Sequence, residues 1–230
     1  MYKNKTFLAV VPARSGSKRL PKKNILSLCG KPLISWSIDA AIKSRYLDKI
    51  VVTSDDDMIL DIANKHGVHA IKRPDELASD SATSYDVVKH TLDNLESYDY
   101  VALLQPTSPL RNETHIDDAI EYMEEKKANA VISVCETDHS PMWSNTLDSS
   151  LSLKDFIKNE FLNKRSQDLD KNYKLNGAIY ICKTDSLIKE QGFFLEDNIY
   201  AFIMDRLSSV DIDQDIDFKI AKALMESRSD

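Results

Sequence analysis

Short apolar runs rich in β-branched residues recur along the chain, and polar segments separate them. Runs of this length and composition predict buried β-strands. They occupy residues 7–11, 49–54, 69–71, 100–105, 130–134, 178–182 and 202–204, of which 69–71 is the weakest. In most of the intervening segments apolar residues recur every three or four positions, which predicts amphipathic helices. These segments are 32–45, 56–66, 84–95, 113–126 and 214–226.

The alternation of strand and helix predicts an α/β fold. Because each helix carries the chain back to begin the next strand, we expect a mostly parallel, doubly wound, Rossmann-like sheet with helices on both faces. A chain of 230 residues fits one such unit, and no stretch rich in Pro, Gly and Ser divides it. We therefore expect a single domain over residues 1–230.

Residues 137–172 interrupt this alternation. The segment is polar, shows no clear period and is too long for a structureless loop inside a compact domain. We interpret it as an excursion from the body of the protein: a lid, a small subdomain, or an arm that packs on another subunit.

Composition excludes several classes of protein. No run approaches the roughly 18 apolar residues of a membrane-spanning helix, and the run at 7–11 is too short for a secretory signal. The three cysteines lie far apart without a CxxC pair, which argues against a disulfide framework or a zinc site and favours a reducing cytoplasm. A formal net charge of −7 disfavours general nucleic-acid binding.

The loop after the first predicted strand carries a local excess of positive charge. Residues 14–23, RSGSKRLPKK, contain five cations and no acid, so removing them from a net charge of −7 leaves −12. Ligands of open α/β sheets bind at the carboxyl ends of strands, where this loop lies. The loop's five cations, together with a backbone that Gly16 allows to approach closely, suit a triphosphate. The hydroxyl and amide side chains of the loop are Ser15, Ser17 and Asn24.

Two other interpretations of this loop stay open: a solvated basic loop and a nucleic-acid patch. The two common phosphate-binding motifs, GxGxxG and GxxxxGK[ST], do not occur in the sequence. A cationic segment in an otherwise acidic chain nevertheless favours a bound polyanion.

An aspartate pair near the carboxyl end is the clearest sign of metal chemistry. In SVDIDQD, Asp211 and Asp213 alternate with apolar residues, so in an extended segment both carboxylates point to one face. Such carboxylates repel each other unless a cation lies between them, and hard oxygen ligands beside a triphosphate indicate Mg²⁺. Asp215 and Asp217 are instead expected to open the last helix, where acids favour the positive end of the helix dipole.

These motifs resemble those of one enzyme family. The segment PARSGSKRLPKKN is similar to the nucleotide-binding signature of the sugar cytidylyltransferases that act on nine-carbon keto acids. This branch holds the acylneuraminate cytidylyltransferases, or CMP-sialic acid synthetases, and their CMP-legionaminic acid relatives. Further segments that resemble family motifs, in the family's order, are RPDELASDSAT (73–83), LLQPTSPLR (103–111), RSQDLDKNYKLNGAIY (165–180), GFF (192–194) and SVDIDQDIDF (209–218).

The resemblance implies a sheet of the nucleotidyltransferase type and a defined set of site residues. The implied catalytic residues are Arg14, Lys23, Asp211 and Asp213, of which the two aspartates are also the metal ligands. The nucleotide-binding set is Arg14, Ser15, Gly16, Ser17, Lys23, Asn24, Arg73, Thr83 and Gln105. The sugar-binding set is Gln105, Trp143, Arg165, Gln167, Tyr180, Phe193 and Phe194.

Several of these segments also have plain structural interpretations. Thr83 fits a helix cap, and Tyr180 with the two phenylalanines fits the hydrophobic core. Arg111 is expected to hold the start of the next helix rather than to touch substrate. Asn176 and Gly177 are expected to form a tight turn that enters a strand.

The chain departs from the family pattern at two positions. Arg19 stands where the family commonly has glycine, which makes the loop less permissive and more cationic. Trp143 stands where neuraminate-specific relatives often have lysine. An aromatic side chain there fits a less hydroxylated sugar, such as a diacetamido-legionaminic acid, so the resemblance leaves neuraminic and legionaminic acids open.

The resemblance implies an Mg²⁺-dependent transfer of CMP from CTP to the anomeric hydroxyl of a nine-carbon keto sugar acid, with release of pyrophosphate. It also implies a cytoplasmic homodimer that serves surface polysaccharide biosynthesis, without nucleic-acid or membrane partners. Three alternatives stay open: a cytidylyltransferase for an eight-carbon keto sugar acid, a metal-dependent glycosyltransferase, and a non-catalytic nucleotide-sensing module.

Overall fold

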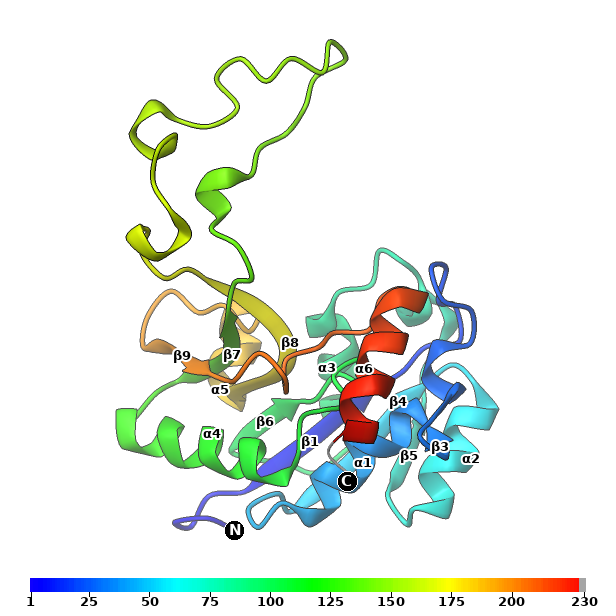
Figure 1. Cartoon of the computed structure of the whole chain (residues 1–230). Helices are drawn as coiled ribbons and strands as arrows, with labels where there is room; N and C mark the ends of the chain where they lie inside the picture. The colour runs from blue at the N-terminus through cyan, green and yellow to red at the C-terminus, as the bar shows by residue number, and fades with distance from the viewer. Residues whose placement is uncertain (228–230) are drawn as a thin grey trace.

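The computed structural model describes residues 1–227 and centres on a seven-stranded sheet (Figure 1). The strands lie in the order β5-β4-β1-β6-β8-β7-β9. Their bounds are β1 (Phe7–Pro12), β4 (Lys49–Ser54), β5 (His69–Lys72), β6 (Tyr100–Leu103), β7 (Ala130–Glu136), β8 (Tyr173–Lys183) and β9 (Ile199–Ile203). Strand β8 is antiparallel to both neighbours, whereas the other neighbouring pairs are parallel. The predicted mostly parallel sheet is confirmed, with one reversed strand.

Helices cover both faces of this sheet. Their bounds are α1 (Leu33–Lys43), α2 (Asp57–Lys65), α3 (Ser84–Asp93), α4 (Glu113–Lys126), α5 (Thr184–Glu190) and α6 (Asp215–Ser227). Helices α1, α2 and α4 share one core with Ala9 and Val11, whereas α3 and α5 share the other with Leu8 and Val10. Because successive side chains of a strand point to opposite faces, β1 supplies both cores. Helix α6 packs on a separate cluster that contains Ile212.

The remaining elements are short. A two-stranded sheet of β2 (Ser27–Leu28) and β3 (Lys31–Pro32) follows the cationic loop. The 3-10 helices are η1 (Lys23–Ile25), η2 (Asp75–Ala78), η3 (Pro141–Trp143), η4 (Asn159–Phe161) and η5 (Ser166–Asp168).

Each predicted helix agrees with an observed one to within two residues at either end. Helix α5 was not predicted, because a helix of seven residues is too short to display a helical period in its sequence. No helix within residues 1–227 combines the length and the apolar character that crossing a membrane requires.

The prediction of a tight turn at Asn176 and Gly177 is wrong, because both residues lie inside β8. The pairing of β8 with β7 changes register between Ile132 and Val134, which marks an irregularity such as a β-bulge. Gly177 has a φ of +72°, in the left-handed region that favours glycine. Sequence therefore located the unusual backbone correctly but assigned it to the wrong kind of structure.

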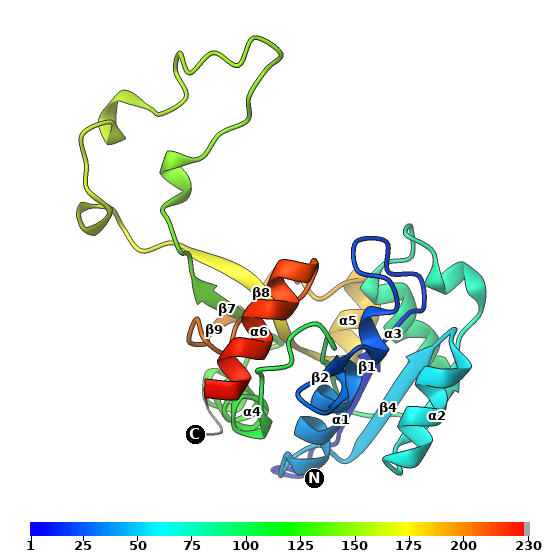
Figure 2. The same ribbon diagram turned by 45° about the vertical axis from the view of Figure 1, so that its right-hand side comes forward.

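The excursion at 137–172 leaves the body between β7 and β8 as an extended arm (Figure 2). It contains η3, η4 and η5 and no strand among its described residues. Its side chains are largely exposed, and the exposed set includes Leu147, Leu151 and Leu153. The expected break in the strand and helix alternation is confirmed, and the arm makes little hydrophobic core of its own.

Candidate active site

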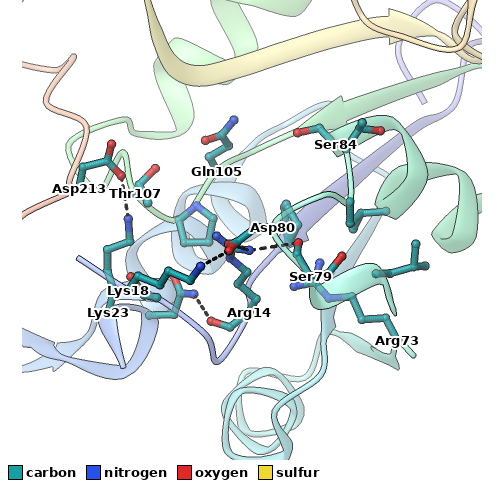
Figure 3. Close-up of a pocket in the computed structure, with 18 of the residues that line it drawn as sticks. Arg14, Lys18, Lys23, Arg73, Ser79, Asp80, Ser84, Gln105, Thr107 and Asp213 are labelled. Atoms are coloured by element: carbon teal, nitrogen blue, oxygen red, sulfur yellow. Dashed lines mark hydrogen bonds and ion pairs between the residues drawn. The ribbon is translucent and has the colours of Figure 1, made fainter. Parts of the chain in front are cut away.

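A cavity of about 460 Å³ opens at the carboxyl ends of β1 and β6 (Figure 3). Its wall consists of the loop 12–24 after β1, the segment 73–87 after β5, residues 105–107 after β6, and Asp213. The lining includes these members of the expected nucleotide-binding set: Arg14, Ser17, Lys23, Asn24, Arg73, Thr83 and Gln105. Segments far apart in sequence thus converge at the edge where α/β folds bind their ligands.

Lys23 joins the cationic loop to the aspartate segment. Its ammonium donates to the carbonyl oxygen of Ile212 at 2.6 Å and pairs with a carboxylate oxygen of Asp213 at 3.2 Å. Only 11% of the Lys23 side chain is exposed, so solvent screens this contact less than a surface ion pair. Arg19 pairs with the other Asp213 oxygen at 3.1 Å. The two charged regions predicted from opposite ends of the sequence therefore meet in one place.

Arg14 is held between its own loop and the loop after η2. The buried side-chain amide of Asn24 donates to the Arg14 carbonyl oxygen at 2.9 Å, which fixes the backbone of the cationic loop. The Arg14 guanidinium donates to the carbonyl oxygen of Ser79 at 3.1 Å and pairs with Asp80 at 2.9 Å. Lys18 pairs with the other carboxylate oxygen of Asp80. Two aspartates that line the cavity, Asp80 and Asp213, thus contact four of the loop's five cations (Figure 3).

Asp55 contacts both the cationic loop and Arg73, and no sequence motif identified it as a site residue. It accepts a hydrogen bond from the backbone nitrogen of Ser15 at 3.1 Å and lies 3.7 Å from the guanidinium of the buried Arg73. Burial raises the pKa of the Asp55 carboxyl, but hydrogen bonds, chiefly from Ser15, and the charge of Arg73 lower the pKa overall. Its position directly after β4, at the carboxyl edge, was the available sequence signal.

Thr83 has a structural role in the fold, whereas Gly16 has no packing role among the described residues. A Cβ atom at Gly16 would meet no other atom within 4 Å, so packing within the described chain does not explain the glycine. Thr83 is the N-cap of α3, where its side chain accepts a hydrogen bond from the backbone nitrogen of Asp86. The capping interpretation of Thr83 is confirmed, and the residue also lines the cavity.

Asp211 lies near Gln105 but does not line this cavity; it lines a neighbouring cavity together with Ser209 and Asp217. A Cβ atom at Gly177 would sit 3.6 Å from both Asp211 Oδ2 and Gln105 Oε1, so both side chains border this glycine. Solvent reaches part of Asp211, but burial of the carboxylate raises its pKa, and the negative charge of Asp213 raises the pKa further. Asp213 lines the cavity and Asp211 does not, so the expectation that both carboxylates bind one metal ion stays a prediction.

The start of α6 fixes the backbone of the aspartate segment. The Asp217 carboxylate accepts hydrogen bonds from the backbone nitrogens of Asp213 at 3.0 Å and Gln214 at 2.8 Å. Asp215 is the first residue of the helix. The prediction that Asp215 and Asp217 open the last helix is confirmed.

A buried polar cluster also holds this segment, and sequence gave no signal for it. The amide nitrogen of Asn176 donates to the Ser209 hydroxyl at 2.9 Å, and its amide oxygen accepts from the Ser133 hydroxyl at 2.6 Å. Arg111 is buried and donates to the Ala178 carbonyl oxygen at 3.0 Å. Arg111 is thus structural as expected, but it holds strand β8 instead of the start of the next helix.

Of the expected sugar-binding residues, Gln105 lines the cavity and the other six do not. Trp143, Arg165 and Gln167 lie on the arm, where Arg165 pairs with Asp168 at 2.9 Å and none of the three lines the cavity. Tyr180 packs edge to face with Phe193, with ring centroids 5.8 Å apart.

The assignment of Phe193 to a sugar pocket needs correction. Phe193 is 6% exposed and belongs to the core beneath α3 and α5, whereas Phe194 is 63% exposed. Leu195 is buried as well, so the chain places the residues on either side of Phe194 in the core and leaves Phe194 at the surface.

A family model described as cytidylyltransferase matches residues 8–229. The chain belongs to the cytidylyltransferase family. The cavity that contains the cationic loop and Asp213 is formed entirely by residues within this match.

Similar proteins within this family act on different sugar acids, according to their names. The cytidylyltransferase is 37% identical over 223 residues to the N-acylneuraminate cytidylyltransferase of Escherichia coli O18:K1:H7, with 96% of this chain and 52% of that protein covered. It spans about half the length of that relative and of similar Streptococcus agalactiae proteins. It is also 37% identical over 229 residues to the CMP-N,N'-diacetyllegionaminic acid synthase of Legionella pneumophila, with 95% and 96% covered. A pseudaminic acid cytidylyltransferase of Campylobacter jejuni is 34% identical, with 94% and 95% covered.

Solved structures with low sequence identity share the fold. A CMP:2-keto-3-deoxy-manno-octonic acid synthetase complexed with CTP superposes with a TM-score of 0.74 at 18% identity, with 97% of this cytidylyltransferase and 99% of that chain covered. A 4-diphosphocytidyl-2C-methyl-D-erythritol synthase from Anaerococcus prevotii gives a TM-score of 0.67 at 17% identity, with 96% of each chain covered.

Proposed function

We propose that the chain transfers CMP from CTP to the anomeric hydroxyl of a nine-carbon keto sugar acid and releases pyrophosphate. The observation that carries this proposal is the contact of Lys23 with Ile212 and Asp213, which unites the cationic loop and the aspartate segment at one cavity. A triphosphate needs cations, and an associated metal needs carboxylates, so one site with both suits a metal-bound nucleotide. The names of the similar proteins support a sialic, legionaminic or pseudaminic acid as acceptor.

In this proposal Asp211 and Asp213 hold Mg²⁺. Within residues 1–227 no group of three or more His, Cys, Asp or Glu side chains is placed to hold a metal by itself. The residues still fit Mg²⁺, because this ion commonly takes one or two carboxylates and completes its shell with water and substrate phosphate. Burial chiefly raises the pKa of Asp211, and the negative charge of Asp213 raises it further, so a bound cation would favour the ionised form of this carboxylate. When bound, the ion would supply positive charge to the phosphate oxygens.

The chain's own residues would orient the nucleotide and offset charge. In the reaction the anomeric hydroxyl loses its proton and its oxygen bonds to the α-phosphorus, while the bond from that phosphorus to the pyrophosphate oxygen breaks. Arg14 and Lys23 are placed to offset the negative charge that grows on the departing pyrophosphate. Gln105 borders both the cavity and Asp211, so its amide suits contacts at the junction of nucleotide and sugar.

We also propose that two copies of the chain assemble through the arm. Trp143, Arg165 and Gln167 are carried away from the cavity of their own chain, so in a dimer they would complete the sugar site of the partner. The exposed leucines of the arm would then be covered. We expect a dimeric mass in solution by light scattering. A chain that is monomeric at working concentration and turns over fully would contradict this assembly.

The decisive experiment measures CTP-dependent pyrophosphate release with neuraminic, legionaminic, pseudaminic and eight-carbon keto sugar acids side by side. We expect release with at least one nine-carbon acid and none without an acceptor. Turnover with the eight-carbon acid alone would replace the proposed substrate class. Binding of CTP without turnover on any acceptor would favour a nucleotide sensor, and consumption of a nucleotide sugar without pyrophosphate release would favour a glycosyltransferase.

A further inference from the structure

Asp80 occupies an unusual place for an acidic residue, because it lines the cavity proposed to bind a triphosphate. One of its carboxylate oxygens lies 2.9 Å from Arg14 Nη1, and the other pairs with Lys18 (Figure 3). We propose that Asp80 competes with polyphosphate for Arg14 and Lys18, so that it sets how tightly the site holds CTP and how readily pyrophosphate leaves. This inference rests on the proposed function for the identity of the nucleotide.

The contacts of Arg14 favour competition over a positioning role. Arg14 also donates to the carbonyl oxygens of Ser79 at 3.1 Å and Ala78 at 3.5 Å. These backbone contacts do not involve the Asp80 carboxylate, so they would hold the guanidinium at the cavity when that carboxylate is absent. Removing the charge of Asp80 would then free positive charge at the site without displacing the residue that carries it.

The segment that carries Asp80 is anchored at its two ends and exposed between them. At one end the backbone nitrogen of the buried Arg73 donates to the carbonyl oxygen of Ser54 at 2.9 Å. At the other end Thr83 and Asp86 form the capping box of α3. Between these anchors the Asp80 side chain is 52% exposed, and the flanking residues 79 and 81 are exposed too. The carboxylate can therefore leave the cations without unfolding the segment.

Charge determines which ligands displace this carboxylate. Hydrogen bonds from Lys18 and Arg14 lower the pKa of Asp80, so the group is ionised near neutral pH and offers one negative charge to two cations. A triphosphate or pyrophosphate carries several negative charges and several oxygens, and it can contact both cations at once. A neutral nucleoside gains nothing from these cations and has no reason to displace Asp80.

The test compares Asp80→Asn with Asp75→Asn, an exposed aspartate of the same segment that does not line the cavity. Both substitutions remove one negative charge from the segment and keep the side-chain shape. Isothermal titration with inorganic pyrophosphate, with CTP and with cytidine is carried out on the full chain without an acceptor. We expect Asp80→Asn to bind pyrophosphate and CTP about two- to tenfold more tightly than the unaltered chain, as an exposed ion pair of this kind allows. Cytidine affinity and the Asp75→Asn variant should stay unchanged.

Two further results separate this inference from its alternatives. The gain of Asp80→Asn should shrink between about 50 and 500 mM salt, because it arises from exposed charges. Weaker or unchanged pyrophosphate binding in Asp80→Asn would overturn the inference, and so would an equal gain in Asp75→Asn or an absence of pyrophosphate binding in the unaltered chain. All of these results are binding affinities, so none of them depends on turnover. A chain that shows the expected affinities but releases no pyrophosphate with any acceptor would overturn the proposed function and leave the role of Asp80 intact.

Discussion

Asp211→Asn is expected to lower the rate of CTP-dependent pyrophosphate release by about 10²-fold or more, because the substitution removes one of the two proposed carboxylate ligands. The amide keeps the shape of the side chain, so the contacts around Gly177 and Gln105 remain possible. Steady-state turnover at saturating CTP and Mg²⁺ measures the effect. Asp215→Asn is the matched control, since Asp215 lies at the exposed start of α6 and should keep near-normal turnover.

The same variant is expected to unfold at an equal or higher temperature than the unaltered chain. Burial raises the pKa of Asp211, so keeping this carboxylate ionised costs folding free energy above its folded-state pKa. That cost disappears as the pH falls below the ordinary pKa of an aspartate, because the group is then protonated in both the folded and the unfolded state. The advantage of Asp211→Asn should therefore be largest near neutral pH and vanish at acidic pH.

Thermal unfolding between about pH 3 and pH 8, with a chelator present, measures this dependence. A loss of turnover together with a marked fall in unfolding temperature would mean that Asp211 acts through the fold. Near-normal turnover would contradict the assignment of Asp211 as a metal ligand.

Lys23→Gln is expected to lower turnover by about 10²-fold, because it removes a charge that would face the departing pyrophosphate. It should also lower the free energy of unfolding by about 1 kcal/mol, since the half-buried ammonium no longer donates to the Ile212 carbonyl oxygen. Steady-state kinetics and thermal unfolding measure the two effects separately. Lys22→Gln removes the same charge from an exposed neighbour outside the cavity. We expect that control to keep turnover within a few-fold of normal.

Equal effects of the two lysine substitutions would mean that the loop contributes only general positive charge. A large loss confined to Lys23→Gln would support a specific role at the junction with the aspartate segment. Addition of KCl helps to separate these cases, since salt screens the general field of exposed charges more than it screens the shielded Lys23 contact.

Simple periodic rules predicted which segments would meet at the cavity, whereas the site residues within those segments were expected from the family resemblance. The loop after β1 follows a buried strand, and an α/β fold brings the loops after its parallel strands to one edge of its sheet. In the aspartate segment, the alternation of Asp211 and Asp213 with apolar residues was the available pattern. The helix bounds were predictable for the same reason, since their apolar faces repeat over several turns. Short or irregular elements such as α5 and the break in β8 carry no repeat that a pattern could reveal.

The roles of residues that depend on contacts between distant segments could not be predicted from sequence patterns. Nothing in the sequence distinguishes Asp80 from other exposed acidic residues, because its ion pairs with Arg14 and Lys18 form only in the folded chain. The sequence indicates a turn at Asn176. Its hydrogen bonds to the hydroxyls of Ser133 and Ser209 could not be predicted, because these serines come from distant segments. Phe193 shows the opposite case, in which a motif suggested a ligand contact and the packing of the chain uses the ring for its core.

Because the arm between β7 and β8 is separate from the cavity, its sequence can change independently of the residues that line the cavity. Lengthening a surface loop costs folding free energy only as the logarithm of its length, so insertions and substitutions at 137–172 weigh little on the stability of the sheet. The residues that line the cavity come from other loops, so they would not have to change when the arm does. Substitutions in the arm would then change which sugar acid the enzyme accepts during evolution, while the nucleotide site stays the same.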